Sequence, residues 1–168
     1  MPKLIYNLQA RLIEEARRQT EESGYGSVTI RSVASACGVG VGTVYNYFPS
    51  KEALLATYLL EDWKNCITAI QAVGTYSDRA EPVMRCIFDQ LLLFAQRHHA
   101  IFQDDAASAA FAGSFSRYHV MLRAQLADPL RRFCPDDFSA DFAAEALLTW
   151  AMAGKSFHEI YGVLCKLF

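Results

Sequence analysis

The segment from Val41 to Lys51 gathers side chains that can form hydrogen bonds to a nucleic acid, and none of its residues is acidic. Hydroxyl groups can donate to phosphate oxygens, and an amide can read the edge of an adenine. The amide belongs to Asn46, and hydroxyl groups are carried by Thr43, Tyr45 and Tyr47 among others. These residue types in one short segment indicate a surface that contacts a DNA duplex.

Two further features of this segment suit such a surface. Val41 and Gly42 are small, and small residues let a helix lie deep in the major groove. Ser50 is a good N-cap for a long helix that starts at Lys51. The free N–H groups of that helix start and the lysine ammonium together would attract a phosphate.

Two short helices, predicted over residues 29–36 and 40–47, must position these side chains. Gly38 lies between them and supplies the positive φ that a sharp corner needs. Two short helices joined by a tight glycine-containing turn form a helix-turn-helix. The apolar residues that would hold the pair together are Val33, Ala34, Val39 and Val44.

Charge is distributed unevenly along the 168 residues. The net charge of −2 does not by itself indicate a nucleic-acid partner. However, residues 23–51 contain no Asp or Glu, whereas acidic residues outnumber basic ones after residue 52. This pattern supports the N-terminal segment as the place where a polyanion binds.

Residues 27–55, with the sequence SVTIRSVASACGVGVGTVYNYFPSKEALL, resemble the DNA-binding signature of the tetracycline-repressor (TetR) family. The resemblance extends back through Gly24-Tyr25-Gly26 and covers nearly a third of the chain. It implies an all-α fold in two domains. Residues 1–52 would form a three-helix, helix-turn-helix DNA-binding head, and residues 53–168 a helical body that binds an effector and dimerises.

The resemblance also implies roles for single residues. Val41, Gly42 and Asn46 would face base edges, and Arg31 would reach a base or a phosphate. The DNA backbone would be held by Thr29, Thr43, Tyr45, Tyr47 and Lys51. Internal packing of one of the two tyrosines, and a solvated or ion-paired Arg31, remain open as alternatives.

The sequence departs from the family at two places. Gly40 stands where family members commonly have Ser as the N-cap of the recognition helix, and Gly caps less well. The N-terminal arm, Met1-Pro2-Lys3, is very short, so readout of the minor groove is not expected.

Helical spacing continues through the rest of the chain, and strand signals are nearly absent. Gly113-Ser114 is predicted to separate two helices, and Pro135–Asp137 to form a turn. The predicted helices span residues 51–73, 79–97, short pieces within 100–110, 114–133 and one last helix over 136–167.

The last predicted helix carries an apolar stripe with small residues among it. Together with the helix before it, it could form half of an intermolecular four-helix bundle. Ordinary intramolecular core is the alternative. The expected homodimer contacts are Ala143, Leu147, Trp150, Gly154, Phe157 and Tyr161. Paired heads would read a palindromic operator.

The resemblance implies a pocket for a small-molecule effector within the body. The aromatic content would suit an apolar or aromatic compound, although each residue could be plain core. The candidate lining residues are Phe88, Leu92, Phe94, Phe102, Phe111, Phe115, Tyr118 and Met121. Effector binding would shift the head spacing away from the one that fits the operator, so that a repressor is released.

The N-terminus shows no secretory signal and no apolar run is long enough to cross a bilayer, which together indicate a cytoplasmic protein. The five cysteines are scattered without zinc spacing. No cofactor, metal or enzymatic activity is expected. Rival hypotheses are a redox-responsive regulator acting through Cys37, a helical adaptor, and a metal-dependent enzyme using His98-His99 and Asp104-Asp105.

Overall fold

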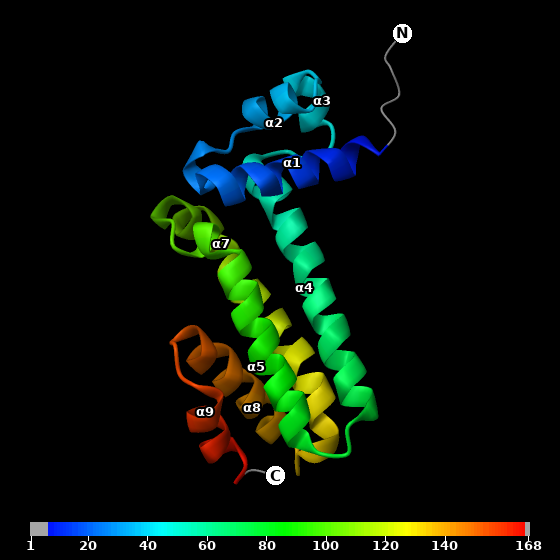
Figure 1. The fold of residues 1–168 in the computed structure, drawn as a ribbon, viewed down its shortest axis with the longest axis vertical. Coiled ribbons are helices and arrows are strands. Elements are labelled where there is room, and N and C mark those ends of the chain that lie inside the picture. Colours follow the sequence, from blue (N-terminus) through cyan, green and yellow to red (C-terminus); the bar gives the residue numbers. More distant parts are fainter. Residues whose placement is uncertain (1–6, 167–168) are drawn as a thin grey trace. The chain divides into compact units, whose positions relative to one another are not determined.

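The computed structural model describes residues 7–166, except for the side chains of residues 112–117. Every regular element in this range is a helix (Figure 1), which confirms the predicted all-α class. The chain divides into two compact units. The head unit contains the residues up to Asp62 together with His98–Ala112, and the body unit contains Trp63–Arg97 and the residues from Gly113 onward.

The head unit begins with α1 (Leu8–Ser23), which ends where Gly24 adopts a φ of 78° and donates its N–H to the Thr20 carbonyl. A 3-10 turn, η1 (Tyr25–Ser27), then leads into the helix-turn-helix. The remaining helices of this unit are α2 (Ile30–Ala36), α3 (Val41–Tyr45), the first half of α4 (Lys51–Tyr76), α6 (His99–Phe102) and the start of α7 (Asp105–Ala127).

Local sequence signals determine where the helices of the helix-turn-helix begin and turn. The Thr29 hydroxyl accepts a hydrogen bond from the Ser32 N–H at 2.9 Å, and the Ser32 hydroxyl accepts one from the Thr29 N–H at 3.0 Å. This capping box starts α2. Gly38 has a φ of 68°, as its predicted place in the corner requires. Ser50 caps α4 through the Ala53 N–H, which confirms the predicted N-cap.

A hydrophobic core joins the helices of the head. Val33, Ala34 and Val44 are buried as predicted, while Val39 packs against them and is only partly buried. The segment after α5 also contributes, because Ile101 and Ala107 are buried in this same core. A segment distant along the chain from α1–α4 therefore completes the head, and the apolar contacts it gains offset the entropy cost of closing the intervening loop.

The body unit packs α5 (Ala80–Arg97) and α8 (Asp137–Met152) against each other, with α9 (Phe157–Leu164) and a 3-10 turn, η2 (Asp128–Phe133), beside them. The second half of α4 and the later part of α7 also belong to it. Its core contains the fully buried side chains of Met84, Ile87, Leu126, Leu130 and Leu147.

Two predictions for the C-terminal half are wrong. Instead of one last helix, the chain forms α8 and α9, because Gly154 adopts a φ of 78° and Ser156 and Glu159 form a new capping box. The predicted boundary at Gly113-Ser114 is absent, since α7 continues from Asp105 to Ala127. The following 3-10 turn has Pro129 near its start, so the α-helix does not reach Phe133.

Candidate nucleic-acid interface

The helix-turn-helix surface contains an open groove of about 630 Å³ in the head unit. Its walls come from the start of α2, the start of α3 and the first turn of α4. Five residues predicted to contact DNA line it together: Thr29, Arg31, Val41, Tyr45 and Lys51. The groove also contains the Glu52 side chain, so it is not lined by basic and neutral residues alone.

The side chains of α3 and the turn after it point into solvent. Tyr45 is 52% exposed and Tyr47 is 45% exposed, which excludes internal packing for both in the free protein. Gly42 and Asn46 are exposed, while Val41 and Thr43 are half-buried. Only Val44 of α3 is buried, so nearly the whole outer face of this helix is accessible to solvent.

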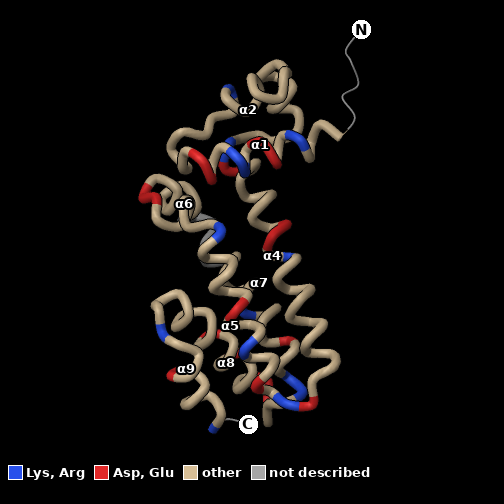
Figure 2. Tube along the Cα trace, viewed as in Figure 1, with Lys and Arg blue, Asp and Glu red and all other residues tan. Residues whose placement is uncertain are grey.

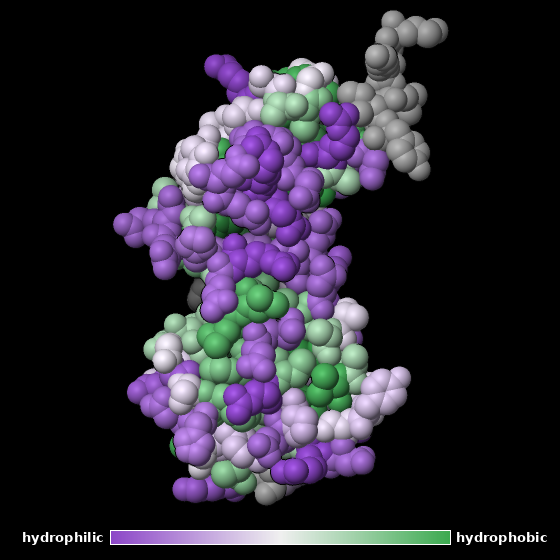
Figure 3. Space-filling model, in the orientation of Figure 1, coloured by the Kyte–Doolittle hydropathy of each residue, from purple (hydrophilic) through white to green (hydrophobic). Residues whose placement is uncertain are grey.

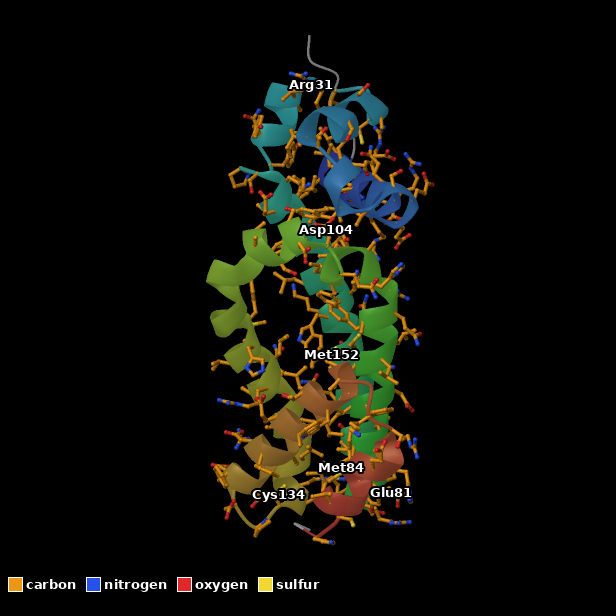
Figure 4. All side chains as sticks on the ribbon, turned by 90° about the vertical axis from the view of Figure 1, so that its left-hand side faces the viewer. Arg31, Glu81, Met84, Asp104, Cys134 and Met152 are labelled. Atoms are coloured by element: carbon orange, nitrogen blue, oxygen red, sulfur yellow. The ribbon has the colours of Figure 1, made fainter. Side chains whose placement is uncertain are left out.

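Arg31 projects from α2 at the outer edge of the head (Figure 4). Its side chain is exposed and, within residues 7–166, has neither an ion pair nor a hydrogen bond to an acidic residue. The α2–α3 trace carries no acidic position (Figure 2). A cation without a protein partner beside an acid-free helix is available to an anionic ligand.

Lys51 differs from Arg31, because it is engaged inside the head. Its Nζ donates a hydrogen bond to the Tyr25 carbonyl oxygen at 2.7 Å and lies 3.6 Å from the centroid of the Tyr25 ring. Burial lowers the pKa of the Lys51 ammonium from its usual value. The prediction that Lys51 contacts phosphate did not foresee this internal partner.

Tyr25 is a functional candidate that the sequence analysis did not single out. Its side chain is only 4% exposed, and its hydroxyl donates to Glu52 Oε1 at 3.1 Å. Burial, and then the Glu52 carboxylate, raise the pKa of Tyr25 to about 12. The Tyr25 ring also meets Phe111 of α7 edge-on, with the centroids 6.4 Å apart. The Gly24-Tyr25-Gly26 sequence was the available signal.

Cys37 lies in the turn between α2 and α3, but its environment does not suit a redox sensor. The side chain is 8% exposed and its thiol donates to the Arg11 carbonyl at 3.7 Å. Burial raises the pKa of the Cys37 thiol, which lowers the fraction of reactive thiolate. This environment weighs against the redox-responsive alternative.

The predicted effector-pocket residues are divided between the two units. Phe102 and Phe111 belong to the head unit, whereas Phe88, Leu92 and Phe94 belong to the body unit. Phe88 is buried in the body core, and Leu92 and Phe94 pack against that core. Tyr118 and Met121 are half-buried on α7, and the Phe115 side chain is outside the described residues.

Three of the predicted dimer contacts are interior residues of the same chain. Ala143, Leu147 and Phe157 are at most 4% exposed and form part of the body core, so the intramolecular alternative applies to them. Gly154 forms the turn between α8 and α9. Trp150 is 51% exposed and Tyr161 is half-buried, so these two remain available to a partner.

A metal-dependent enzyme would need a cluster of ligands that includes His98-His99 or Asp104-Asp105. His98 is buried against Asp62, with Nε2 and Oδ2 3.1 Å apart. Among the described residues, no group of three or more His, Cys, Asp or Glu side chains is arranged to hold a metal ion. In that same part of the chain, no helix combines the length and hydrophobicity that crossing a bilayer requires.

Residues 12–58 match the model of the bacterial regulatory proteins of the tetR family. The chain is 34% identical over 74 residues to YuxN, an HTH-type transcriptional regulator of Bacillus subtilis strain 168. The aligned residues make up 44% of this chain and 25% of YuxN. It is 28% identical over 122 residues to the transcriptional repressor KstR of Rhodococcus jostii RHA1, covering 71% of this chain and 56% of KstR. The matches thus span between a quarter and somewhat over half of these relatives.

Two solved structures share the fold along nearly the whole chain. FadR of Thermus thermophilus, a TetR family transcriptional repressor in complex with lauroyl-CoA, aligns with a TM-score of 0.64 at 20% identity over 95% of this chain and 92% of FadR. RolR in complex with resorcinol aligns with a TM-score of 0.63 at 22% identity over 95% of this chain and 84% of RolR. The helix-turn-helix head followed by a helical body is therefore confirmed as the fold. The chain thus carries, over residues 12–58, the sequence signature of the tetR family of bacterial regulatory proteins, and it shares the fold of these two structures.

Proposed function

We propose that this protein is a sequence-specific DNA-binding transcriptional regulator, which binds a palindromic operator as a homodimer and is released by a small-molecule effector. The default for the family is repression. The observation that carries the proposal is the groove at the start of α2, α3 and α4, because it joins hydroxyl, aromatic and cationic side chains on one exposed surface.

The proposed contacts divide into base readout and backbone positioning. Val41, Gly42 and Asn46 lie along α3 and the turn after it, where they would reach base edges in the major groove. Thr29 keeps its hydroxyl hydrogen for a phosphate, since its oxygen already accepts from the Ser32 N–H. Thr43, Tyr45 and Tyr47 supply further hydroxyl donors, and Arg31 supplies a cation.

The test is a binding-site selection with the purified full chain and a random-sequence duplex library, followed by affinity measurements at several salt concentrations. Recovery of a palindromic sequence whose affinity falls steeply with salt supports the proposal. Tyr45→Ala should weaken binding at least about tenfold, because an exposed contact is lost from the interface. A helical adaptor would show neither result.

Tyr76→Ala is the matched control. Tyr76 is 86% exposed on α4 and belongs to the body unit, so its removal should leave operator affinity unchanged. Recovery of no sequence by a well-folded protein, or equal losses for Tyr45→Ala and Tyr76→Ala, would contradict the proposal.

The homodimer is proposed to form through the outer face of α8. Phe138 and Phe142 are 77% and 48% exposed, and Trp150 is 51% exposed on the same helix. Apolar patches are visible on the body unit in Figure 3. A second copy is the partner that the DNA geometry requires, since one helix-turn-helix reads only a half-site. Sedimentation of Phe138→Ser with Trp150→Ser should show a monomer, whereas Tyr76→Ala should remain dimeric.

The effector is proposed to be a small apolar or aromatic molecule held in the body unit. Phe88, Leu92, Phe94, Tyr118 and Met121 remain the candidates there, and Phe102 and Phe111 are less suitable because they belong to the head unit. The experiment adds a panel of aromatic and acyl compounds to the protein–operator complex. Release by a compound that also raises the melting temperature of the free protein supports an effector site.

A further inference from the structure

We infer that α3 reads A·T base pairs, so that the part of each operator half-site under this helix consists of adenine and thymine. Because it concerns the bases that the proposed interface reads, this inference rests on the proposed function. It follows from the chemical groups that α3 and the turn after it present to solvent, and from those that they lack.

The outer surface of α3 carries no formal charge. Residues 32–50 contain no Asp, Glu, Lys, Arg or His. In the major groove a guanine offers two acceptors, which a guanidinium or ammonium group matches, and a cytosine offers an amino group, which a carboxylate matches. Since α3 supplies neither kind of group, a G·C pair under it would gain no charged partner.

The amide group of Asn46 matches adenine. Asn46 is exposed in the turn after α3, where its backbone N–H donates to the Gly42 carbonyl at 3.2 Å. An amide can donate to N7 of adenine and accept from its N6 amino group at the same time. Guanine has an acceptor in both of these places, so the amide oxygen of Asn46 would face a second acceptor.

Val41 and Gly42 suit the methyl group of thymine. Val41 is half-buried at the first position of α3 and lines the groove, so its methyl groups are accessible there. A Cβ placed on Gly42 would meet no protein atom within 4 Å, so the space beside it is open to a base edge. The thymine methyl is an apolar group that cytosine lacks, and an apolar side chain contacts it favourably.

Arg31 can read a guanine from outside α3. Among the described residues that line the groove, only Arg31 carries a guanidinium group, and it projects from α2 at the outer edge of the head (Figure 4). The other cation of the groove, Lys51, is assigned to the DNA backbone. A guanine in the half-site would therefore be read by Arg31 and would flank the pairs that α3 reads.

The first experiment repeats the binding-site selection with the full chain and with two variants. The wild type should recover half-sites with adjacent A·T pairs. Asn46→Ala should remove the preference at one of these pairs, whereas Arg31→Ala should leave the A·T pairs unchanged and affect only a flanking G·C pair. Asn65→Ala is the matched control, since Asn65 is exposed on α4 in the body unit and its loss should change no preference.

The second experiment uses modified duplexes of the recovered sequence. Each thymine of the half-site is replaced in turn by uracil, which lacks the methyl group, and each adenine by 7-deazaadenine, which lacks the N7 acceptor. At one position uracil should weaken wild-type binding about fourfold, as expected for one buried methyl group. At another position 7-deazaadenine should weaken it at least about fivefold, because a bidentate contact is broken.

The same duplexes assign each contact to a side chain. The uracil effect should vanish in Val41→Ser and the 7-deazaadenine effect in Asn46→Ala, because each pair of changes removes one contact. Circular dichroism establishes that each variant is folded at the assay temperature. If Val41→Ser does not fold, the wild-type measurements on the modified duplexes decide alone.

An Asn46-dependent pair that is G·C would overturn the inference. Wild-type affinity that is the same for every modified duplex would overturn it too, since neither the methyl group nor N7 would then be contacted. So would a uracil effect of equal size in the wild type and in Val41→Ser. None of these results would affect the proposed function, which fails only if the wild-type chain selects no sequence.

Discussion

The guanidinium group of Arg17 donates hydrogen bonds from Nη1 to both oxygens of the Asp62 carboxylate, at 3.0 Å to Oδ1 and 2.8 Å to Oδ2. Arg17 belongs to α1 and Asp62 to α4, so the pair joins two helices of the head unit. His98 approaches the same carboxylate, with Nε2 3.1 Å from Oδ2. The side chains of Asp62 and His98 are 5% and 2% exposed, so water screens the charge of the Asp62 carboxylate little.

Asp62→Asn should lower the free energy of unfolding by about 3 kcal/mol. The amide keeps the shape of the carboxylate but removes the buried ion-pair partner of Arg17, whose other partner, Glu14, is exposed and lies 3.5 Å away. Urea unfolding of the full chain measures the loss. Glu61→Gln is the matched control, because Glu61 is exposed and its change should stay within about 0.5 kcal/mol. A loss below about 1 kcal/mol for Asp62→Asn would refute the argument.

Gly74→Ala should destabilise the body unit although Ala favours helices. A Cβ at Gly74 would lie 2.9 Å from Cβ of Pro129, and a proline ring cannot rotate away. The overpacking should cost about 1–3 kcal/mol, which exceeds the helix preference of about 1 kcal/mol. Gly162→Ala in α9 meets nothing within 4 Å and should be neutral or stabilising. Thermal unfolding distinguishes them, and equal melting temperatures would count against the predicted clash.

Gly40→Ser should stabilise the head by about a few tenths of a kcal/mol. Gly40 is the N-cap of α3 with extended backbone angles and no side-chain cap, so a serine hydroxyl can supply the missing acceptor. Gly38→Ser should cost about 1–2 kcal/mol, because Gly38 has a φ of 68°. Chemical denaturation of both variants measures this opposite pair of effects. Similar stabilities for the two variants would show that the corner does not depend on backbone conformation.

The contribution of Glu52 to stability should depend on pH. Hydrogen bonds from its own N–H and from Ser50 and Tyr25 keep the folded-state pKa of Glu52 below its usual value of 4.5. The stabilisation is therefore present above about pH 4.5 and is lost as the pH falls through the lower folded-state pKa. Wild type and Glu52→Gln should differ in unfolding free energy at pH 7 and converge in acid. A difference that is constant with pH would exclude this linkage.

The sequence by itself determined the elements whose signals are local. Thr29, Gly38 and Ser50 act on neighbouring backbone groups, through a cap or a positive φ, so their types and spacing predicted the helix-turn-helix. The Ser156-x-x-Glu159 capping box was equally local and marked the start of α9, but the longer apolar stripe outweighed it in the prediction. The exposed face of α3 also followed from its polar and aromatic residues.

Only the tertiary structure decided the contacts between residues that are distant along the chain. Nothing near Asp62 in the sequence indicates Arg17 or His98, and nothing near Lys51 indicates that its ammonium turns to Tyr25. Helical periodicity predicts that a residue is apolar and on one face, but it does not identify the residues that pack against it. For this reason Leu147 was predicted to lie in a dimer interface, whereas it is buried in the body core, and Phe111 was predicted to lie in the body, whereas it belongs to the head unit. The physical reason is that burial and ion pairing depend on which surfaces meet, and folding sets this through the packing of all helices at once.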